Sequence, residues 1–366
     1  MRALTVVPGT KKMSVRTIPV PSLDTDDTLV RITRVGFTRR DRLILENPQT
    51  VLPDDAEYII PGHIAVGRVV ETGPLVRDLQ VGDIVVPTIR RDCNKCIDAR
   101  SDLCPHPERY MDSGLTGAHG FAREFISMKS RYLVKVPEEL EEQALLLAPL
   151  SVAEKAHSEA LEIAKRFDFY CYHDAEYLAP RALVSGIGPV GIMTTYLLSL
   201  YNYRITVFCR RKSDDDRSII FEPLEVEYIN TSRVPLDRLE KAGYSFRHIF
   251  ETTGDPAYII RTIPLMSSNA VMVLMAMPES LSRDNRIDID AGYLFGRMIS
   301  GNQVIIGSIK SGRDAFESAV KHLVELNDLF GGELSRLVTH TYPLEEYEKI
   351  LALKSRDTIL PVFDLT

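Results

Sequence analysis

The chain has 366 residues, of which 26% are charged and 45% hydrophobic, and this composition is typical of a soluble globular protein with about two domains. Its 44 Lys and Arg against 51 Asp and Glu give a formal net charge of −7, which argues against a broad basic face for nucleic acid. No stretch approaches the roughly 20 apolar residues of a membrane span, and the start MRALTVVPGTKK has no secretion signal, so we expect a cytoplasmic protein without nucleic-acid or membrane partners.

The first 150 residues predict short strands separated by Gly, Pro and Asp, without strand–helix alternation. The β-rich runs are MRALTV (1–6), DTLVRITRVG (27–36), GRVVETG (67–73), GDIVVPTI (82–89) and YLVKVP (132–137). From Leu145 the pattern changes, because apolar residues at helical spacing predict a helix over 145–167.

Strands and helices then alternate, which implies a parallel doubly wound sheet. The strands are expected in RALVSGIG (181–188), RITVFCR (204–210), FRHIFETTG (246–254), NAVMVLMAM (269–277) and QVIIGSI (303–309). Helices are expected over 189–202 and 313–330. The fold class is therefore α/β, with an irregular β domain followed by a Rossmann-type domain.

A glycine-rich run directly follows the strand ALVS and opens a helix. It consists of Gly186, Ile187, Gly188, Pro189, Val190 and Gly191. The first glycine permits a tight turn, the second lets the backbone approach a pyrophosphate, and the third allows the helix to pack closely on the strand. In this context the run predicts a dinucleotide site, the alternative being a coincidental glycine-rich turn.

The end of the next strand selects the cofactor. Cys209 lies eighteen positions after Gly191 and is followed by Arg210, Arg211 and a lysine, with no carboxylate to bind the ribose hydroxyls of NAD. Guanidinium groups bind a 2′-phosphate, so the sequence favours NADP over NAD. The alternative is a solvated basic turn balanced by the acidic residues 214–216.

The motifs together resemble the medium-chain dehydrogenase/reductase superfamily, and within it the archaeal glucose (aldose) 1-dehydrogenases. The resemblance runs almost end to end through PGHIAVGRVVETG, VGDIVVPTIRRDCNKC, GLTGAHGFAREFI, LLLAPLSVAEKA, ALVSGIGPVGIM, VFCRRK, ETTGDP and NQVIIGSI. It implies a GroES-like catalytic domain over 1–180 and 305–366, a Rossmann NADP-binding domain over 181–304, and a homo-oligomer. The family's arginine pair for the NADP phosphate matches Arg210 and Arg211.

The resemblance also locates a catalytic zinc site whose ligands are mostly substituted. The positions of the family's thiolate and of two carboxylate-type ligands carry Thr38, Ile64 and Ala148, so only His63 remains. Since a catalytic zinc needs about three protein ligands, we expect none here. His63 is then the candidate catalytic proton donor, or else a buried structural histidine. Arg40 could bind an anionic sugar if it points inward, or it faces solvent with its neighbours.

Three clustered cysteines, Cys93, Cys96 and Cys104, match part of a four-cysteine structural zinc lobe in the family. Ala99 stands at the third ligand position. Candidate fourth ligands are Asp98, Asp102 and, best placed, His106. The alternatives are a degenerate lobe with reduced thiols or a Cys93–Cys96 disulfide.

The sequence thus predicts an NADP-dependent oxidoreductase that transfers hydride with a sugar-like alcohol or aldehyde, either neutral or anionic, without a catalytic zinc. Asp112 stands where the family has a substrate-binding Glu, and Lys310 where an Asn is expected. Because the ligand losses would also suit an inactive relative, the second hypothesis is a non-catalytic NADP-binding paralogue that serves as a redox sensor or assembly subunit.

Overall fold

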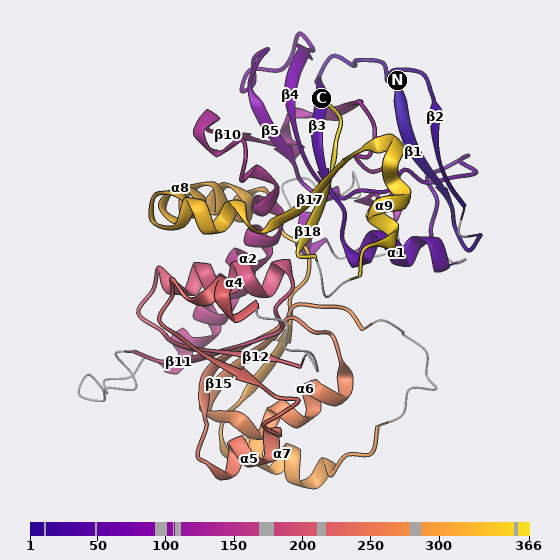
Figure 1. Cartoon of the computed structure of the whole chain (residues 1–366). Coiled ribbons are helices and arrows are strands. Elements are labelled where there is room, and N and C mark those ends of the chain that lie inside the picture. Colours follow the sequence, from indigo (N-terminus) through magenta and orange to yellow (C-terminus); the bar gives the residue numbers. More distant parts are fainter. Residues whose placement is uncertain are drawn as a thin grey trace. The chain divides into compact units, whose positions relative to one another are not determined.

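Figure 1 shows the computed structural model of the chain. It describes residues 1–10, 12–47, 50–91, 101–104, 106, 111–167, 179–210, 217–278, 287–354 and 358–366. These residues form two compact units, Met1–Ser151 with Lys310–Thr366, and Val152–Ile309. The division predicted from the sequence, a catalytic domain over 1–180 with 305–366 and an NADP-binding domain over 181–304, stays a prediction. No helix in the described part of the chain is both long and apolar enough to cross a bilayer.

The first unit consists mainly of β-strands, as the sequence predicts. Its strands are β1 (Arg2–Val7), β2 (Lys12–Thr17), β3 (Asp27–Gly36), β4 (Ile64–Thr72), β5 (Ile84–Pro87), β6 (Arg90–Arg91), β7 (Met111–Ser113), β8 (Gly117–Ala118), β9 (Phe125–Lys129), β10 (Leu133–Val136), β17 (Val338–Pro343) and β18 (Leu360–Asp364). Its helices are α1 (Arg39–Glu46), α8 (Arg313–Ser335) and α9 (Tyr347–Ala352). Among the described residues, the main sheet has the order β10-β5-β4-β3-β18-β17, and β9 also pairs with β3.

The C-terminal strands complete the sheet that the N-terminal strands begin. In β18, Val362 is the antiparallel partner of Gly36 at the end of β3, and β18 and β17 run beside β3 in Figure 1. The alternation in β3 explains its place in the middle of the sheet, because Val30 and Ile32 are fully buried while Arg31 between them is exposed. The chain therefore returns to the first unit at its C-terminal end.

Helix α1 interrupts a region where the sequence analysis expected only strands and turns, and that expectation was wrong. Thr38 is the N-cap of α1, and Asp41 at its third position completes a capping box. Ile44 and Leu45 then bury one face of the helix. The Thr-x-x-Asp spacing was the signal in the sequence that could have predicted this helix. The capping box and the buried apolar face together explain why the short helix forms.

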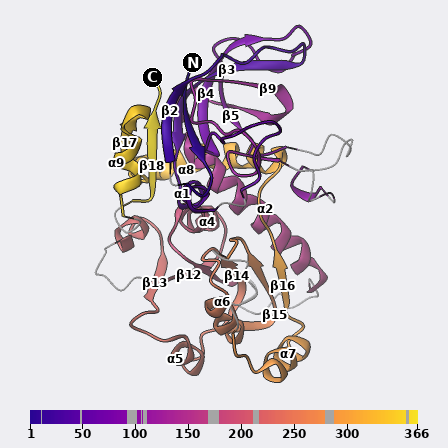
Figure 2. The same ribbon diagram turned by 90° about the vertical axis from the view of Figure 1, so that its right-hand side faces the viewer.

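The second unit is a parallel sheet with helices on both faces. It contains β11 (Arg181–Ser185), α4 (Pro189–Ser199), β12 (Arg204–Cys209), β13 (Val226–Asn230), α5 (Leu236–Lys241), β14 (Phe246–Glu251), α6 (Pro256–Thr262), β15 (Met266–Leu274), α7 (Ala291–Ser300) and β16 (Val304–Gly307), together with most of α2 (Leu147–Ala164). The strand order among the described residues is β13-β12-β11-β14-β15-β16, and every pairing is parallel. The predicted α/β class, with a doubly wound sheet, is confirmed, and Figure 2 shows β12, β14, β15 and β16 beside α6 and α7.

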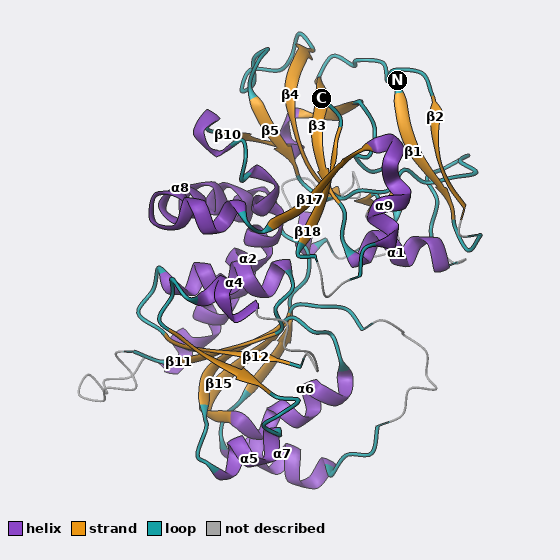
Figure 3. Cartoon of the chain, in the orientation of Figure 1, coloured by secondary structure: helices purple, strands orange, loops and turns teal. Residues whose placement is uncertain are grey.

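The core of this unit forms where alternate strand residues meet the helices. Leu183, Phe208, Ile249 and Met272 are at most 1% exposed and pack with apolar residues of α5, α6 and α7. Figure 3 shows these helices on one face of the sheet and α4 on the other. Burying each large side chain contributes roughly 1.5–3 kcal/mol to stability. This core therefore stabilises the sheet whose strand ends carry the residues described below.

Candidate active site

A buried carboxylate–imidazole pair forms the chemical centre of the first unit. The capping box of α1 fixes Asp41, and His63 lies directly before β4. Asp41 Oδ1 is 2.9 Å from His63 Nδ1 and accepts the backbone N–H of Gly62 at 3.1 Å. Its Oδ2 accepts both the backbone N–H and the hydroxyl of Thr38, at 2.8 and 2.9 Å. The pair is therefore held by four hydrogen bonds to one carboxylate.

These contacts set the proton distribution of the pair. Burial disfavours the charged form of Asp41, but the adjacent His63 and the hydrogen bonds from Thr38 outweigh it and hold the pKa of the carboxyl below its ordinary value. An ionised carboxylate can only accept, so His63 carries its proton on Nδ1. No described residue hydrogen-bonds Nε2, which is thus the ring nitrogen left to exchange a proton with another molecule.

A second cluster of buried charges surrounds Asp112. Arg90 donates to both of its carboxylate oxygens, at 2.9 and 3.0 Å, and Lys310 Nζ lies 3.8 Å from Oδ2. Burial opposes ionisation of Asp112, but Lys310 and Arg90 hold its pKa below the ordinary value. Burial also lowers the pKa of Lys310, only partly offset by Asp112, and the charges of Arg40 and Arg90 lower it further.

Two of the three arginines that follow Thr38, Arg40 and Arg42, have different surroundings. Arg40 is exposed, and its charge acts on Lys310, so it lies near the buried cluster. Arg42 instead donates to three carbonyls at the end of α9, those of Ile350, Leu351 and Leu353 at 2.7, 3.2 and 2.7 Å. This guanidinium caps a helix C-terminus and is not available to a substrate, contrary to the idea that all three face solvent.

Few metal donors lie among the described residues around His63. Thr38 carries a hydroxyl and Ala148 a buried methyl group, and neither side chain is a thiolate or a carboxylate. Both oxygens of Asp41 are already occupied by hydrogen-bond donors. Over the described residues, no group of three His, Cys, Asp or Glu side chains is arranged to hold a metal ion. One free imidazole nitrogen is fewer than the about three protein ligands that a catalytic zinc ion needs.

The predicted cysteine lobe is only partly described. Cys93 and Cys96 lie outside the described residues, so the predicted zinc site stays a prediction. Cys104 Sγ lies 3.9 Å from His106 Nδ1, and this places the third predicted thiol next to the fourth ligand that the sequence favoured.

In the second unit, the glycine run has the geometry that its spacing predicts. Gly186 has φ +106°, and a Cβ on it would lie 2.6 Å from Thr252 Oγ1. A Cβ on Gly191 would lie 2.1 Å from the carbonyl oxygen of Gly186, so helix and turn could not approach as they do. Gly188 has no atom within 4 Å of its Cβ position and is the N-cap of α4, which begins with Pro189 and Val190. The open face above Gly188 and the N–H groups of α4 suit an anion.

The end of β12 carries the predicted phosphate-binding arginine. Cys209 is buried, and its carbonyl accepts the N–H of Thr231 at 2.7 Å. Arg210 follows it, forms an ion pair with Asp255 and lies 4.8 Å from the ring centroid of Tyr258. With its side chain 41% exposed, Arg210 can reach a bound ligand. Arg211 lies outside the described residues.

Two residues near this loop were not assigned from the sequence. Glu251 ends β14, is fully buried and accepts hydrogen bonds from Thr253 and Gly254; burial raises its pKa despite these bonds. Its place in the ETTGDP motif was the available signal. Arg217 donates to the carbonyl of Ile187 at 3.2 Å, and nothing in the sequence pattern pointed to it.

Two family models match successive parts of the chain. Residues 141–365 match the family model described as Glucose dehydrogenase C-terminus, and residues 24–138 match the Alcohol dehydrogenase GroES-like domain. The chain is 33% identical to Glucose 1-dehydrogenase of Thermoproteus tenax and 32% identical to Glucose 1-dehydrogenase 1 of Caldivirga maquilingensis, with 95% of each chain covered in both cases.

Among solved structures, the chain is similar to Haloferax mediterranei glucose dehydrogenase in complex with NADP, Zn and gluconolactone. The TM-score is 0.87 at 28% identity, and the match covers 100% of this chain and 99% of the other. It is also similar to 2R,3R-butanediol dehydrogenase from Bacillus subtilis, with a TM-score of 0.79 at 21% identity over 100% and 99% of the chains, which shows the fold alone.

Proposed function

The chain belongs to the glucose dehydrogenase family of medium-chain oxidoreductases, and from this premise we propose that it transfers hydride between NADP and a sugar-like alcohol or aldehyde without a catalytic zinc. The Asp41–His63 pair carries the proposal, because it provides a fixed proton acceptor at the position where the family places metal ligands. The predicted non-catalytic paralogue would not need that pair.

NADP is the proposed cofactor. The glycine turn and the N-terminus of α4 would hold the pyrophosphate, and Arg210 would bind the 2′-phosphate in exchange for its pair with Asp255. The Haloferax relative, whose structure contains NADP, supports the same cofactor.

In the oxidation direction, the substrate carbon gives hydride to the nicotinamide and the hydroxyl oxygen loses a proton. We assign that proton to His63 Nε2. Asp41 keeps the imidazole in one tautomer and stabilises the imidazolium that forms. Reduction runs the same steps in reverse, with His63 as the donor. The atoms and charges balance without a metal-bound alkoxide.

The charges near this pair favour an anionic sugar as the substrate. Arg40, Arg90 and Lys310 are three basic groups, whereas Asp112 and Asp41, which both act on Lys310, are two carboxylates, so the basic groups exceed the carboxylates by one. A phosphate or carboxylate on the substrate would balance this excess. Asp112, oriented by Arg90, would accept a hydrogen bond from a sugar hydroxyl.

A homo-oligomer is the proposed assembly, with a second copy of the chain against the β16 edge. β16 has β15 as its only neighbour among the described strands, and α7 beside it exposes Phe295 by 59% and Ile299 by 78%. Pairing of two such edges would cover apolar surface that is unusual on a free monomer. The cytoplasmic location remains a prediction from the sequence.

The test is turnover by purified, chelator-treated protein. Glucose, glucose 6-phosphate, gluconate and other aldoses and their phosphates are offered with NADP or NAD, and reduced cofactor is followed by absorbance. We expect NADP-dependent turnover without metal, with phosphorylated or carboxylated sugars preferred. NADP binding without turnover on any sugar would favour the paralogue, and oxidation of glucose that requires added zinc would overturn the zinc-free mechanism.

A further inference from the structure

The second unit contains a large cavity that the nucleotide site does not use. It has a volume of about 1100 Å³, more than a single inorganic phosphate fills and in the range of sites for whole metabolites. Its walls come from the start of β11, β12, β14 and β15 and from the ends of α2 and α7. Gly186 directly follows β11 and Cys209 is the last residue of β12, whereas the cavity is lined by the first residues of these strands. The cavity therefore lies at the opposite ends of the strands from Gly186 and Cys209.

The separation follows from strand length. β12 has six residues, and a strand of this length spans about 20 Å. Arg204 begins β12 at the cavity, and Cys209 ends it near the glycine turn. A molecule in the cavity therefore does not contact the pyrophosphate-binding loop.

The lining is cationic. Lys165, Arg181, Arg204, Arg247 and Arg297 contribute side chains, and none of the described residues that line the cavity is acidic. Three carboxylates stand just behind them: Glu162 pairs with Lys165, and Glu227 and Glu240 lie 3.9 Å from Arg181 and Arg297. Arg247 donates a hydrogen bond to the carbonyl of Ser268, with a distance of 3.5 Å.

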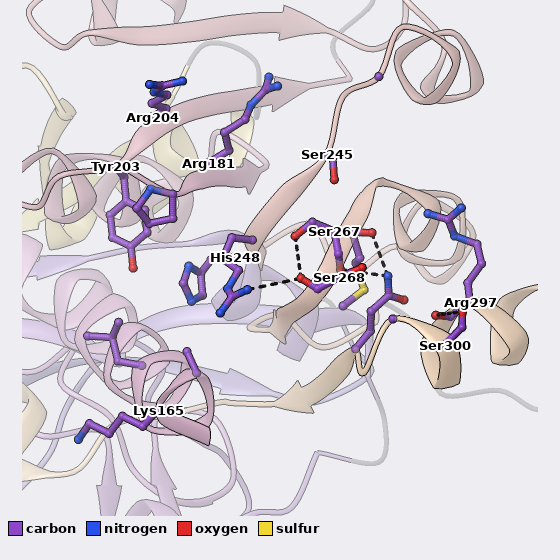
Figure 4. Close-up of a pocket in the computed structure, with 18 residues that line it drawn as sticks. Lys165, Arg181, Tyr203, Arg204, Ser245, His248, Ser267, Ser268, Arg297 and Ser300 are labelled. Atoms are coloured by element: carbon purple, nitrogen blue, oxygen red, sulfur yellow. Dashed lines mark hydrogen bonds between the residues drawn. The ribbon is translucent and has the colours of Figure 1, made fainter. Parts of the chain in front are cut away.

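Arg204 is the cation most open to a ligand. It is exposed, and its guanidinium has no hydrogen-bond or ion-pair partner among the described residues. Arg181 is oriented differently, because it stacks over the rings of Tyr244 and Phe246 at 5.1 and 5.4 Å, which fixes the plane of its guanidinium. Figure 4 shows Arg181 and Arg204 on one side of the cavity and Arg297 with Ser300 on the other.

Neutral donors and unpaired polar atoms lie between these sides. Ser245 makes no hydrogen bond with a described side chain, and Ser267 and Ser268 flank the middle of the cavity in Figure 4. His248 is 4% exposed, and neither ring nitrogen has a hydrogen-bond partner among the described residues. Burial, and then the positive charge of Arg247, lower the pKa of His248 to about 3. The imidazole is thus neutral at physiological pH and adds no positive charge to the wall.

We propose that this cavity binds a small molecule that carries a diphosphate or triphosphate group. Guanidinium groups on two sides match a chain of phosphates, because each planar fork can donate two parallel hydrogen bonds to phosphate oxygens. The hydroxyls between them bind the remaining oxygens. A single phosphate would reach only one side of a cavity of this volume.

Titration calorimetry of the full-length protein with sodium triphosphate, at roughly physiological salt, tests the proposal. We expect one binding site that persists when NADP is saturating. Arg204→Glu should weaken binding by more than about tenfold, because it removes a charge-assisted contact and introduces repulsion. Arg204→Lys should retain part of the affinity. Parallel titrations with ATP distinguish a nucleotide from a bare polyphosphate as the source of the phosphate chain.

Arg238→Glu is the matched control, since Arg238 is an exposed arginine of the same unit that does not line the cavity. Arg210→Ala separates this proposal from the NADP assignment, because it should weaken NADP and leave triphosphate unchanged. The proposal is overturned if triphosphate does not bind at millimolar concentration, if Arg204→Glu and Arg238→Glu weaken it equally, or if NADP or Arg210→Ala abolishes its binding.

Discussion

The sharpest prediction concerns Asp41→Asn, which keeps the size of the side chain and removes one acceptor oxygen. The native carboxylate accepts two donors on each oxygen, at 2.8 to 3.1 Å. An asparagine can orient its carbonyl toward one pair only, and its NH2 group then faces the other two donors. Each buried donor left unsatisfied costs about 1–3 kcal/mol, so with two such donors we expect the free energy of unfolding to fall by about 2–6 kcal/mol.

Urea denaturation of the purified variants measures this loss. Thr38→Ser is the control, because it retains the hydroxyl that donates to Asp41 and should cost less than about 1 kcal/mol. With the best substrate, kcat of Asp41→Asn should fall by about 10²-fold or more while the affinity for NADP is unchanged, since the imidazole loses its fixed tautomer. A loss of stability below about 1 kcal/mol would refute the described hydrogen bonds of Asp41. An unchanged kcat would refute the proposed role of His63 in proton transfer.

Arg210→Ala should raise the Kd for NADP by about tenfold or more and that for NAD little, as measured by fluorescence titration; equal changes would contradict the phosphate assignment. Lys310→Met should raise KM for phosphorylated sugars more than for neutral ones in steady-state assays, and a uniform change would contradict anion binding. Because the folded-state pKa of His248 is about 3 against 6.5 ordinarily, the unfolded chain binds the proton first, and stability should fall by about 2 kcal/mol from pH 7 to pH 5. His248→Phe should flatten that profile in urea denaturation, and an unaltered slope would show that another group is responsible.

The elements with strong periodicity or fixed glycine chemistry could be predicted from the sequence. The glycine turn is the clearest case: Gly186 and Gly191 are required by atoms only a few residues away, so local spacing contained the information. The strands of the parallel sheet were likewise visible as apolar runs between helices. Helix α1 was missed because eight residues with a single capping box give little periodic signal.

Long-range contacts decided the chemistry. By the family resemblance, His63 was the one zinc-ligand position that kept its residue type. The sequence did not show that Asp41, twenty-two residues earlier, would form a hydrogen bond with His63 Nδ1. Lys310 looked only like a departure from the family pattern until the returning chain placed it 3.8 Å from Asp112. Arg40 and Arg42 are two positions apart on α1, yet the charge of Arg40 acts on Lys310 whereas Arg42 donates to carbonyls at the C-terminus of α9.

The α/β class, the family and the loop suited to a dinucleotide could be predicted from the sequence alone, because each depends on patterns within short stretches of chain. Only the tertiary structure decided which charges are buried together. The Asp41–His63 pair, the Asp112 cluster and the cationic cavity at the start of the parallel strands all join residues far apart in the chain. Their pKa values and partners follow from burial and distance, which exist only once the chain has folded.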